Sequence, residues 1–478
     1  MNSMDKEKTK KKKLPRRKAG NNWKKFWKLG MEEFNTQNFD VNGNGELVVK
    51  EGYYQYNMMD IVRKYGTVTR VFFPFILENR VRDLIELFNA YIKILNYKGK
   101  FFCHYVMKSN QNRDFVLPAI AEGEHIEVSS INELFLVKRM LEQDKFNRKI
   151  RVTCNGPKTE QYISLIEELR GKGVIIIPII ENHQELYRFE KFKGEVGVRV
   201  NLDLKVDAHF DKKYNHFGFD EEELYKIGKI RNLSMLHYHI STQNEKIEGF
   251  IKPLKRAVLL YSKLRQHNPN LDTINFGGGM AVPYEKRKKM FSVKNLVHKI
   301  IKTVKRESDK LGIKHPNLVC EWGSYFTAPS QITIFKILCD KTIFKKTDTK
   351  WYFIDGSFIT HLTDTWSPVR HKWHFTTANN LNSRRLQKVW LAGSTCDSDD
   401  RYTASGSYVL LPKLSEDTPE LYLVAFDTGS YQDTFENNHC LLSRPAIVVC
   451  QNGEVKLSRK RQTSEDLGKL FGWNGDHK

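Results

Sequence analysis

The sequence predicts an α/β protein that combines a parallel (β/α)8 barrel of the TIM type with a mainly β second domain. Between residues 76 and 330, eight strand-like segments are mostly separated by segments with helical spacing of apolar residues, and this alternation is typical of a parallel barrel. Beyond residue 330, short strand-like segments follow one another across turns, which indicates a β domain. A chain of 478 residues is long enough for both.

The segment that precedes the barrel is expected to have two parts, a basic disordered tail over residues 1–44 and strands over residues 45–75 that join the β domain. Residues 1–28 contain twelve Lys or Arg and only two acidic residues, within a chain of net charge +22. A segment with this much charge does not fold by itself. It could contact nucleic acid or an acidic membrane, but no nucleic-acid-binding signature accompanies it, so a solvated tail is the simpler interpretation.

The predicted barrel strands are short runs rich in apolar residues. They are Phe101–Met107, His125–Val128, Ile150–Cys154, Val174–Ile180, Glu195–Leu202, Ser234–Ile240, Asp272–Phe276 and Asn317–Glu321. The second domain is predicted over residues 331–478, with strands at Ile332–Leu338, Trp351–Ile354, Lys388–Trp390, Tyr408–Leu410, Leu421–Phe426 and Ala446–Cys450, and a short helix near the C-terminus. Functional residues of such barrels lie at the C-terminal ends of the strands.

Composition also bears on the compartment of the cell. No apolar run approaches the roughly 18 residues of a membrane-spanning helix, and the N-terminal lysines are not followed by the apolar core of a secretory signal. The seven cysteines lie far apart and none has CxxC spacing. Reduced thiols in the cytoplasm are therefore expected.

Lys108 ends the first predicted barrel strand, in the segment KFFCHYVMKSN. Burial of an ammonium group is costly and lowers its pKa. A partly desolvated lysine at the end of a strand can therefore form a Schiff base with a carbonyl cofactor. Taken alone, this segment is explained as simply by a lysine that points into water where the strand stops.

Other polar residues end later strands. Glu127 ends the second strand, and the triplet Gly277-Gly278-Gly279 follows the seventh. Three glycines leave backbone N–H groups free to approach a phosphate, although a flexible turn is an equally good interpretation. Glu321 ends the eighth strand, where an acid could stabilise a protonated ring nitrogen or pair with a barrel arginine such as Arg199.

His237 and His239 alternate along the sixth strand, so both imidazoles face the same side. They could bind a metal, although no third ligand has a recognisable spacing. A histidine packed in the core is the usual alternative, and an imidazole stacked on a planar cofactor is a third.

A last cluster lies in the β domain, where Cys396 and Asp397 begin the segment CDSDD. The thiol could donate a proton and an acid could bind a cationic group of a substrate. An exposed acidic turn is the simpler interpretation, and the spacing does not match a calcium-binding loop.

The order of these motifs resembles the pyridoxal-phosphate decarboxylases of the alanine-racemase-like fold, called fold type III, and among them the biosynthetic arginine decarboxylases. The matching segments, within roughly residues 45–450, are FPFILENRVRDL, YVMKSNQNRD, HYHISTQ, INFGGGMAV, CEWGSY, DTW at Asp364–Trp366, TCDSDD and GSYQDTFENNHCL. The segments GSYQD and KSNQ favour the arginine enzymes over those for ornithine or diaminopimelate.

The resemblance implies pyridoxal 5'-phosphate (PLP) as cofactor and a homodimer with shared active sites. No metal is expected, because His237 and His239 lack a recognisable third ligand. Lys108 would bind the cofactor covalently, His239 would stack on its ring and Glu321 would bind the ring nitrogen. The other cofactor-binding residues implied are Glu127, Arg199, Thr242, Gly277, Gly278, Gly279 and Tyr431. Cys396 and Asp397 would reach into the partner's site, as proton donor and substrate contact. Asp364 is a second acid for a cationic substrate.

Two features depart from the family pattern. Ser324 stands where the family has an arginine, and the chain is shorter than a typical bacterial biosynthetic arginine decarboxylase, which carries an additional helical insertion. The leading expectation is decarboxylation of L-arginine to agmatine, a step of polyamine biosynthesis. The alternatives are a decarboxylase of ornithine, lysine, diaminopimelate or a carboxylated polyamine, and a non-catalytic regulatory relative.

Overall fold

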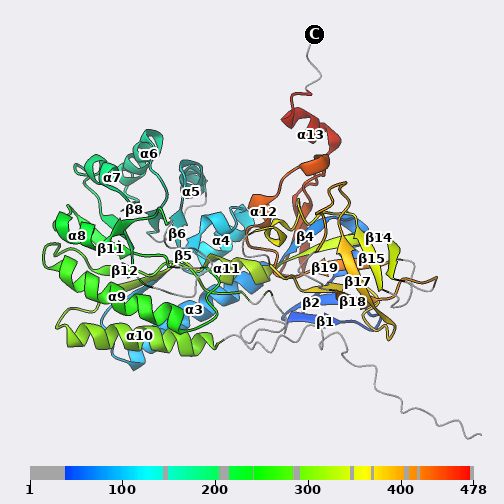
Figure 1. Cartoon of the computed structure of the whole chain (residues 1–478), viewed down its shortest axis with the longest axis horizontal. Helices are drawn as coiled ribbons and strands as arrows, with labels where there is room; N and C mark the ends of the chain where they lie inside the picture. The colour runs from blue at the N-terminus through cyan, green and yellow to red at the C-terminus, as the bar shows by residue number, and fades with distance from the viewer. Residues whose placement is uncertain are drawn as a thin grey trace, which may run out of the picture.

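A computed structural model describes residues 38–143, 149–202, 204, 215–240, 242–282, 284, 291–344, 349–367, 371–402, 408–416 and 420–473. The chain forms a helix-covered barrel and, beside it, a body built mainly of strands (Figure 1). Most of the predicted basic tail, up to residue 37, lies outside the described residues.

The barrel contains all eight predicted strands. They are β5 (Phe101–Val106), β6 (His125–Val128), β7 (Arg151–Cys154), β8 (Ile175–Ile180), β9 (Val196–Asn201), β11 (Leu233–His237), β12 (Thr273–Asn275) and β13 (Asn317–Cys320). The hydrogen-bonded order is β9-β11-β12-β13-β5-β6-β7-β8, all parallel, and the pairing of β8 with β9 closes the ring. The short β10 (Phe219–Asp220) extends the sheet beside β9. The parallel barrel is thus confirmed.

Helices cover the outside of the barrel. They are α3 (Pro74–Ile94), α4 (Arg113–Ala121), α5 (Ile131–Gln143), α6 (Glu160–Gly171), α7 (His183–Arg188), α8 (Glu221–Ile227), α9 (Glu248–Arg265) and α10 (Val293–Lys310). Helix α10 illustrates the cause: Ser292 caps its first turn, and an apolar stripe that includes Leu296 and Ile300 is buried. Burying each such side chain stabilises the fold by roughly 1.5–3 kcal/mol. None of the helices described is long and apolar enough to cross a membrane.

The second sheet has the order β18-β17-β15-β14-β4-β20-β21, and β19 pairs with both β14 and β16. Its strands are β4 (Thr69–Phe72), β14 (Gln331–Phe344), β15 (Thr349–Ile354), β16 (Phe375–Thr377), β17 (Leu386–Ala392), β18 (Val409–Pro412), β19 (Tyr422–Ala425), β20 (Ala446–Gln451) and β21 (Glu454–Arg459). The predicted mainly β domain is confirmed, although β16 and β21 were not predicted. Strand β21 reads EVKLSR and is mostly exposed, so no apolar run marks it.

The residues before the barrel form β1 (Phe39–Val41), β2 (Leu47–Glu51), β3 (Tyr54–Asn57) and α2 (Met58–Tyr65). Strand β1 pairs with β2 and buries Phe39, so the expectation of a disordered tail as far as residue 44 is wrong at its end. That expectation followed the charge of the tail, whereas the buried Phe39 holds β1 in place. The predicted C-terminal helix is present as α13 (Ser464–Leu470).

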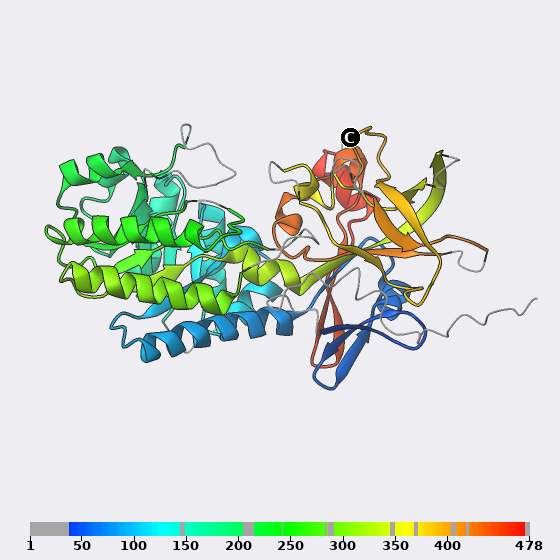
Figure 2. The same ribbon diagram turned by 60° about the horizontal axis from the view of Figure 1, so that its bottom comes forward.

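Two connections join the barrel to the second sheet. Strand β4 leads directly into α3, and β13 leads through α11 (Gly323–Thr327) into β14 (Figure 2). Because β4 lies between β14 and β20, both connections leave the sheet at its centre. The C-terminal ends of the barrel strands β5 and β13 are thereby held against the β domain.

Candidate active site

A cavity of about 340 Å³ lies where the barrel meets the β domain. Its barrel side carries Lys108, His239 and Glu321, and its β-domain side carries Asp364 and Tyr431. Thr242, Gly278 and Gly279 also line it. Most of the residues that the sequence singled out are therefore brought together at the C-terminal end of the barrel.

Lys108 lies in a single 3-10 turn, η2 (Met107–Ser109), that directly follows β5. Its ammonium is 3.7 Å from Oε1 of Glu127, a fully buried acid that also accepts hydrogen bonds from Ser129 and Asn155, each of 2.8 Å. Burial acts to lower the pKa of Lys108, as the sequence predicts, but the attraction of Glu127 and other acidic groups outweighs it and the pKa is raised. The expectation of a lowered pKa is thus wrong for the chain without a cofactor, because the buried acid Glu127 lies beside the lysine.

Glu321 directly follows β13 and is buried. Its two carboxylate oxygens lie 2.7 Å from the amide nitrogen of Asn275 and 3.4 Å from Nε2 of His237. Burial acts to raise the pKa of Glu321, but His237, Lys108 and Asn275 more than offset it and hold the pKa well below its usual range. The carboxylate is therefore ionised across the physiological pH range.

Arg199 is not the partner of Glu321. Its guanidinium lies 3.4 Å from Glu181 and over the ring of Phe217, 4.2 Å from the ring centre. The alternative in which Glu321 pairs with Arg199 is therefore wrong. Arg199 is nevertheless close enough to act on the pKa of His239.

His239 lies two residues beyond β11, and its Nδ1 accepts a 3.1 Å hydrogen bond from the backbone N–H of Gly278. Burial, and then the positive charges of Arg199 and Lys108, lower the pKa of His239 to about 3. The ring is therefore neutral with its proton on Nε2. His237 contacts Glu321 instead, and no group of three or more metal-ligating side chains occurs among the described residues.

The glycine triplet packs closely against this histidine. Gly277 has φ +66°, and a Cβ there would lie 2.5 Å from the carbonyl oxygen of Tyr238. A Cβ at Gly278 would lie 2.8 Å from the carbonyl oxygen of Glu321. Glycine is thus required by space as well as by conformation, and the backbone here is open toward the cavity.

On the opposite side, Asp364 belongs to a 3-10 turn, η5 (Thr363–Thr365). Gln432 donates a 2.7 Å hydrogen bond to its carboxylate, and Nδ1 of His371 lies 3.4 Å from the same oxygen. Burial raises the pKa of Asp364 to about 6, although hydrogen bonds from Gln432 and Ser367 act against it. His371 and Gln432 were not predicted from the sequence. A histidine a few residues after the DTW segment was the available signal for His371.

Tyr431 and Ser324 both line the cavity, and their two segments are in contact. Tyr431 precedes α12 (Gln432–Phe435) with a left-handed φ of 64°. Its backbone N–H donates a 2.8 Å hydrogen bond to the carbonyl of Ser109. Ser324 accepts a 3.0 Å hydrogen bond from the hydroxyl of Ser430.

Cys396 and Asp397 lie apart from the cavity of their own chain, since neither lines it. Both are exposed: the Cys396 sulfur is 3.9 Å from that of Cys440, and the Asp397 carboxylate is 3.5 Å from His439.

The residues present fit PLP. The cavity holds an amine for an aldehyde and an ionised carboxylate for a ring nitrogen, and Gly278 and Gly279 line it without side chains that would keep a phosphate from the backbone. The buried Oε2 of Glu127 has no hydrogen-bond partner among the described residues.

Known proteins agree with this geometry. Residues 81–328, just over half of the chain, match the pyridoxal-binding domain of the pyridoxal-dependent decarboxylases. A biosynthetic arginine decarboxylase of Phocaeicola vulgatus is 26% identical over 74% of this chain. The matched region covers only 59% of the length of that decarboxylase. A diaminopimelate decarboxylase of Methanocaldococcus jannaschii is 25% identical over 89% of this chain and 96% of its own.

Solved structures share the fold. The crystal structure of the M. jannaschii diaminopimelate decarboxylase has a TM-score of 0.78 at 23% identity, covering 91% of this chain and 97% of that one. The biosynthetic arginine decarboxylase of Campylobacter jejuni has a TM-score of 0.80 at 19% identity, covering 93% and 90%. The match across the barrel, together with a lysine, an acid and a glycine loop at its C-terminal end, shows that the chain belongs to the pyridoxal-dependent decarboxylase family, whose cofactor is pyridoxal phosphate.

Proposed function

We propose that this chain is a PLP-dependent decarboxylase of a basic amino acid, with L-arginine as the preferred substrate. The observation that carries the proposal is the cavity itself. It has an amine and a permanently ionised acid on the barrel side, and a second buried acid, Asp364, on the facing side. The first pair suits the cofactor and the second acid suits a cationic substrate.

When bound, PLP supplies an electron sink for the carbon that loses CO2. Lys108 would hold the cofactor through its aldehyde, Glu321 would keep the ring nitrogen protonated, and neutral His239 would lie on the ring face. Gly277, Gly278 and Gly279 with Thr242 and Tyr431 would hold the phosphate. Glu127 would position the amine of Lys108, and Arg199 would support the ring.

The cation-binding role of Asp364 follows from its surroundings. A buried carboxyl without a charged partner keeps its proton up to a high pH, and a bound cation favours the ionised form. A guanidinium can also form two parallel hydrogen bonds with a carboxylate. Among the described residues that line the cavity, Lys108 is the only Lys or Arg. This favours arginine over diaminopimelate, because the far end of diaminopimelate carries a carboxylate that needs a cation of its own.

Diaminopimelate remains the second candidate for one reason: the chain spans 96% of the M. jannaschii enzyme but only 59% of the P. vulgatus arginine decarboxylase. Release of CO2 from arginine, diaminopimelate, ornithine, lysine and a carboxylated polyamine should therefore be compared on one preparation. We expect the highest kcat/KM with arginine. A preference for diaminopimelate would overturn the substrate proposal and leave the cofactor proposal standing. If PLP binds but no substrate releases CO2, the chain is a regulatory relative.

We further propose that two copies form a homodimer in which Cys396 and Asp397 act in the partner's cavity, the thiol as proton donor to the substrate carbon and the acid as a substrate contact. Their exposure and distance from the cavity of their own chain support this. A mixture of Lys108→Ala and Cys396→Ala chains tests it. Heterodimers with one intact site should restore about a quarter of the wild-type activity. Heterodimers that form without restoring activity would exclude shared sites.

The proposed compartment is the cytoplasm. All seven cysteines are free, including Cys396 and Cys440, whose sulfurs are 3.9 Å apart. A reducing compartment keeps such thiols available. Fractionation of the source cells with an antibody to the chain tests this placement.

A further inference from the structure

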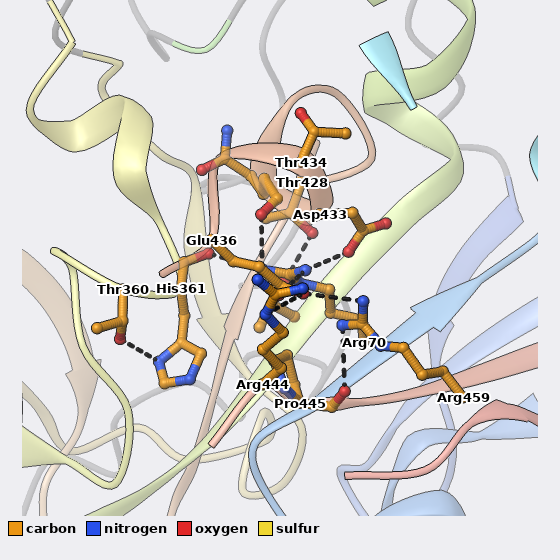
Figure 3. A network of polar contacts seen from close by, with 12 residues as sticks. Arg70, Thr360, His361, Thr428, Asp433, Thr434, Glu436, Arg444, Pro445 and Arg459 are labelled. Atoms are coloured by element: carbon orange, nitrogen blue, oxygen red, sulfur yellow. Dashed lines mark hydrogen bonds and ion pairs between the residues drawn. The ribbon is translucent and has the colours of Figure 1, made fainter. Parts of the chain in front are cut away.

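A fully buried arginine of the β domain, Arg70, lies outside the cavity. Arg70, in β4 at the centre of the sheet, is fully buried and pairs with the carboxylates of Asp433 and Glu436, the latter at 2.7 Å (Figure 3). Its guanidinium also donates hydrogen bonds to the carbonyls of His361 and Gln432, at 3.0 and 3.1 Å. A buried guanidinium with this many partners fixes the segments that contact it.

Asp433 connects Arg70 to the segment that carries Lys108. One of its oxygens binds Arg70, and the other accepts a 2.8 Å hydrogen bond from the side-chain amide of Asn110. Asn110 follows Lys108 by two residues, and Asp433 follows Tyr431 by two. The series Arg70–Asp433–Asn110 therefore links the centre of the β sheet to both segments that present cavity side chains.

Further hydrogen bonds join the same two segments. The Asn110 amide also donates to the carbonyl of Gly429 at 3.0 Å, and the Tyr431 N–H donates to the carbonyl of Ser109 at 2.8 Å. Tyr431 has a left-handed φ of 64°, a conformation that a tyrosine keeps only where its surroundings enforce it. These contacts hold the 429–433 segment in register with the turn that carries Lys108.

We propose that Arg70, Asp433 and Asn110 form a positioning clamp that sets where the Lys108 amine and the Tyr431 side chain lie in the cavity. The clamp residues do not line the cavity, so they act through Lys108 and Tyr431. The inference rests on the proposed function, in which these two side chains hold the cofactor. It gives the β domain a part in cofactor binding that the barrel alone does not supply.

The other arm of the network provides a matched control. Glu436 also pairs with Arg70, but its other ion-pair partners are Arg459 at 2.8 Å and Arg444 at 3.8 Å, which are not part of the link from Arg70 through Asp433 to Asn110. Figure 3 shows both arginines beside Glu436. Loss of the Glu436 charge disturbs the same buried arginine without breaking the link to Lys108.

The test measures three properties of the full-length chain: the Kd for PLP by absorbance titration, the rate at which borohydride fixes PLP on Lys108, and the Tm without cofactor. Asn110→Ala and Asp433→Asn should each raise the Kd about tenfold, the size expected from loss of a hydrogen bond to a charged group. They should also slow the fixation on Lys108. Glu436→Gln should lower the Tm but keep the Kd within about twofold of wild type.

A double-variant cycle sharpens the result. If the link is real, the double variant Asn110→Ala with Asp433→Asn should have the same Kd for PLP as either single variant. In the double variant Asn110→Ala with Glu436→Gln, the fold-changes in Kd of the two single variants should multiply. Wild-type chain that binds no PLP would refute the proposed function and the clamp together. Wild-type binding with unchanged Kd and fixation rate in Asn110→Ala and Asp433→Asn would refute the clamp alone. Asn110→Ala decides the matter if Asp433→Asn does not fold.

Discussion

The two walls of the cavity each carry a buried acid, and the pKa values of the two acids are shifted in opposite directions. On the barrel wall, burial acts to raise the pKa of Glu321, but His237, Lys108 and Asn275 outweigh it and the pKa is lowered. On the β-domain wall, burial raises the pKa of Asp364 to about 6, and only neutral hydrogen-bond donors oppose it. Glu321 therefore carries a permanent charge, whereas the charge of Asp364 depends on pH and on a bound cation.

The difference indicates which wall of the cavity carries its negative charge before a ligand binds. A permanent charge costs nothing to create when its partner arrives, so the barrel wall suits a resident cofactor. A conditional charge is formed with its partner, so the β-domain wall suits a substrate that enters and leaves in every cycle. Substitutions on the two walls therefore separate these two roles.

Lys108→Ala should have the largest effect, because it removes the group that would bind the cofactor covalently. We expect loss of the PLP–peptide adduct after borohydride reduction and a fall in kcat of about a thousandfold or more. Lys100→Ala is the matched control, since Lys100 is exposed and precedes the opposite end of β5. An adduct of normal yield on another lysine of the Lys108→Ala chain would contradict the assignment.

Glu321→Gln should have the next largest effect, since it keeps the size of the side chain but removes the permanent charge. The ring nitrogen would lose its ionic partner, and we expect kcat to fall about a hundredfold with little change in KM. Steady-state kinetics on PLP-saturated protein measure both constants. A larger change in KM than in kcat would mean that Glu321 serves the substrate and that the two walls do not differ as proposed.

Asp364→Asn should act mainly on substrate binding. Above pH 7 we expect the KM for arginine to rise about tenfold, with a smaller change in kcat. The KM of the wild type should rise as the pH falls through about 6, because Asp364 takes up its proton there. The variant should lack this dependence, and a KM profile that keeps it would assign the titration to another group.

The same substitution should stabilise the chain without substrate. The pKa of Asp364 in the fold, about 6, lies above its ordinary value of 3.8, so the folded state binds the proton more tightly than the unfolded chain. The free energy of unfolding therefore falls as the pH rises from about 4 to about 6, and stays level above that. Asp364→Asn should recover roughly 1–3 kcal/mol at pH 7.5, measured by urea unfolding. Equal stability of the two chains at that pH would contradict the burial argument.

The two walls also differ in how far the sequence predicts them. The barrel strands are short runs rich in apolar residues, and Lys108, His239 and Glu321 lie at or just beyond their ends, where functional residues of such barrels are found. On the β-domain wall, Asp364, His371 and Gln432 meet only through tertiary packing. Residues far apart in the sequence form these contacts, so no local spacing predicts them. Asp364 was predicted from the family resemblance, whereas His371, Gln432 and the Arg70 network were not predicted.

Ser324 should have the smallest effect, and it tests how much the barrel wall depends on one neutral contact. It lines the cavity, and its hydroxyl accepts a 3.0 Å hydrogen bond from Ser430. A neutral hydrogen bond at a partly buried site contributes only about 0.5–1.5 kcal/mol. If this pair supports the phosphate end of the cavity, Ser324→Ala and Ser430→Ala should each raise the Kd for PLP about threefold or less.

The double variant Ser324→Ala with Ser430→Ala should be no worse than either single variant, because both remove the same hydrogen bond. Absorbance titration with PLP measures all four chains. A rise in the Kd for PLP of about a hundredfold would show that this neutral pair is essential for cofactor binding. A rise in the Kd of threefold or less would instead mean that PLP binding depends mainly on the other groups that line the cavity.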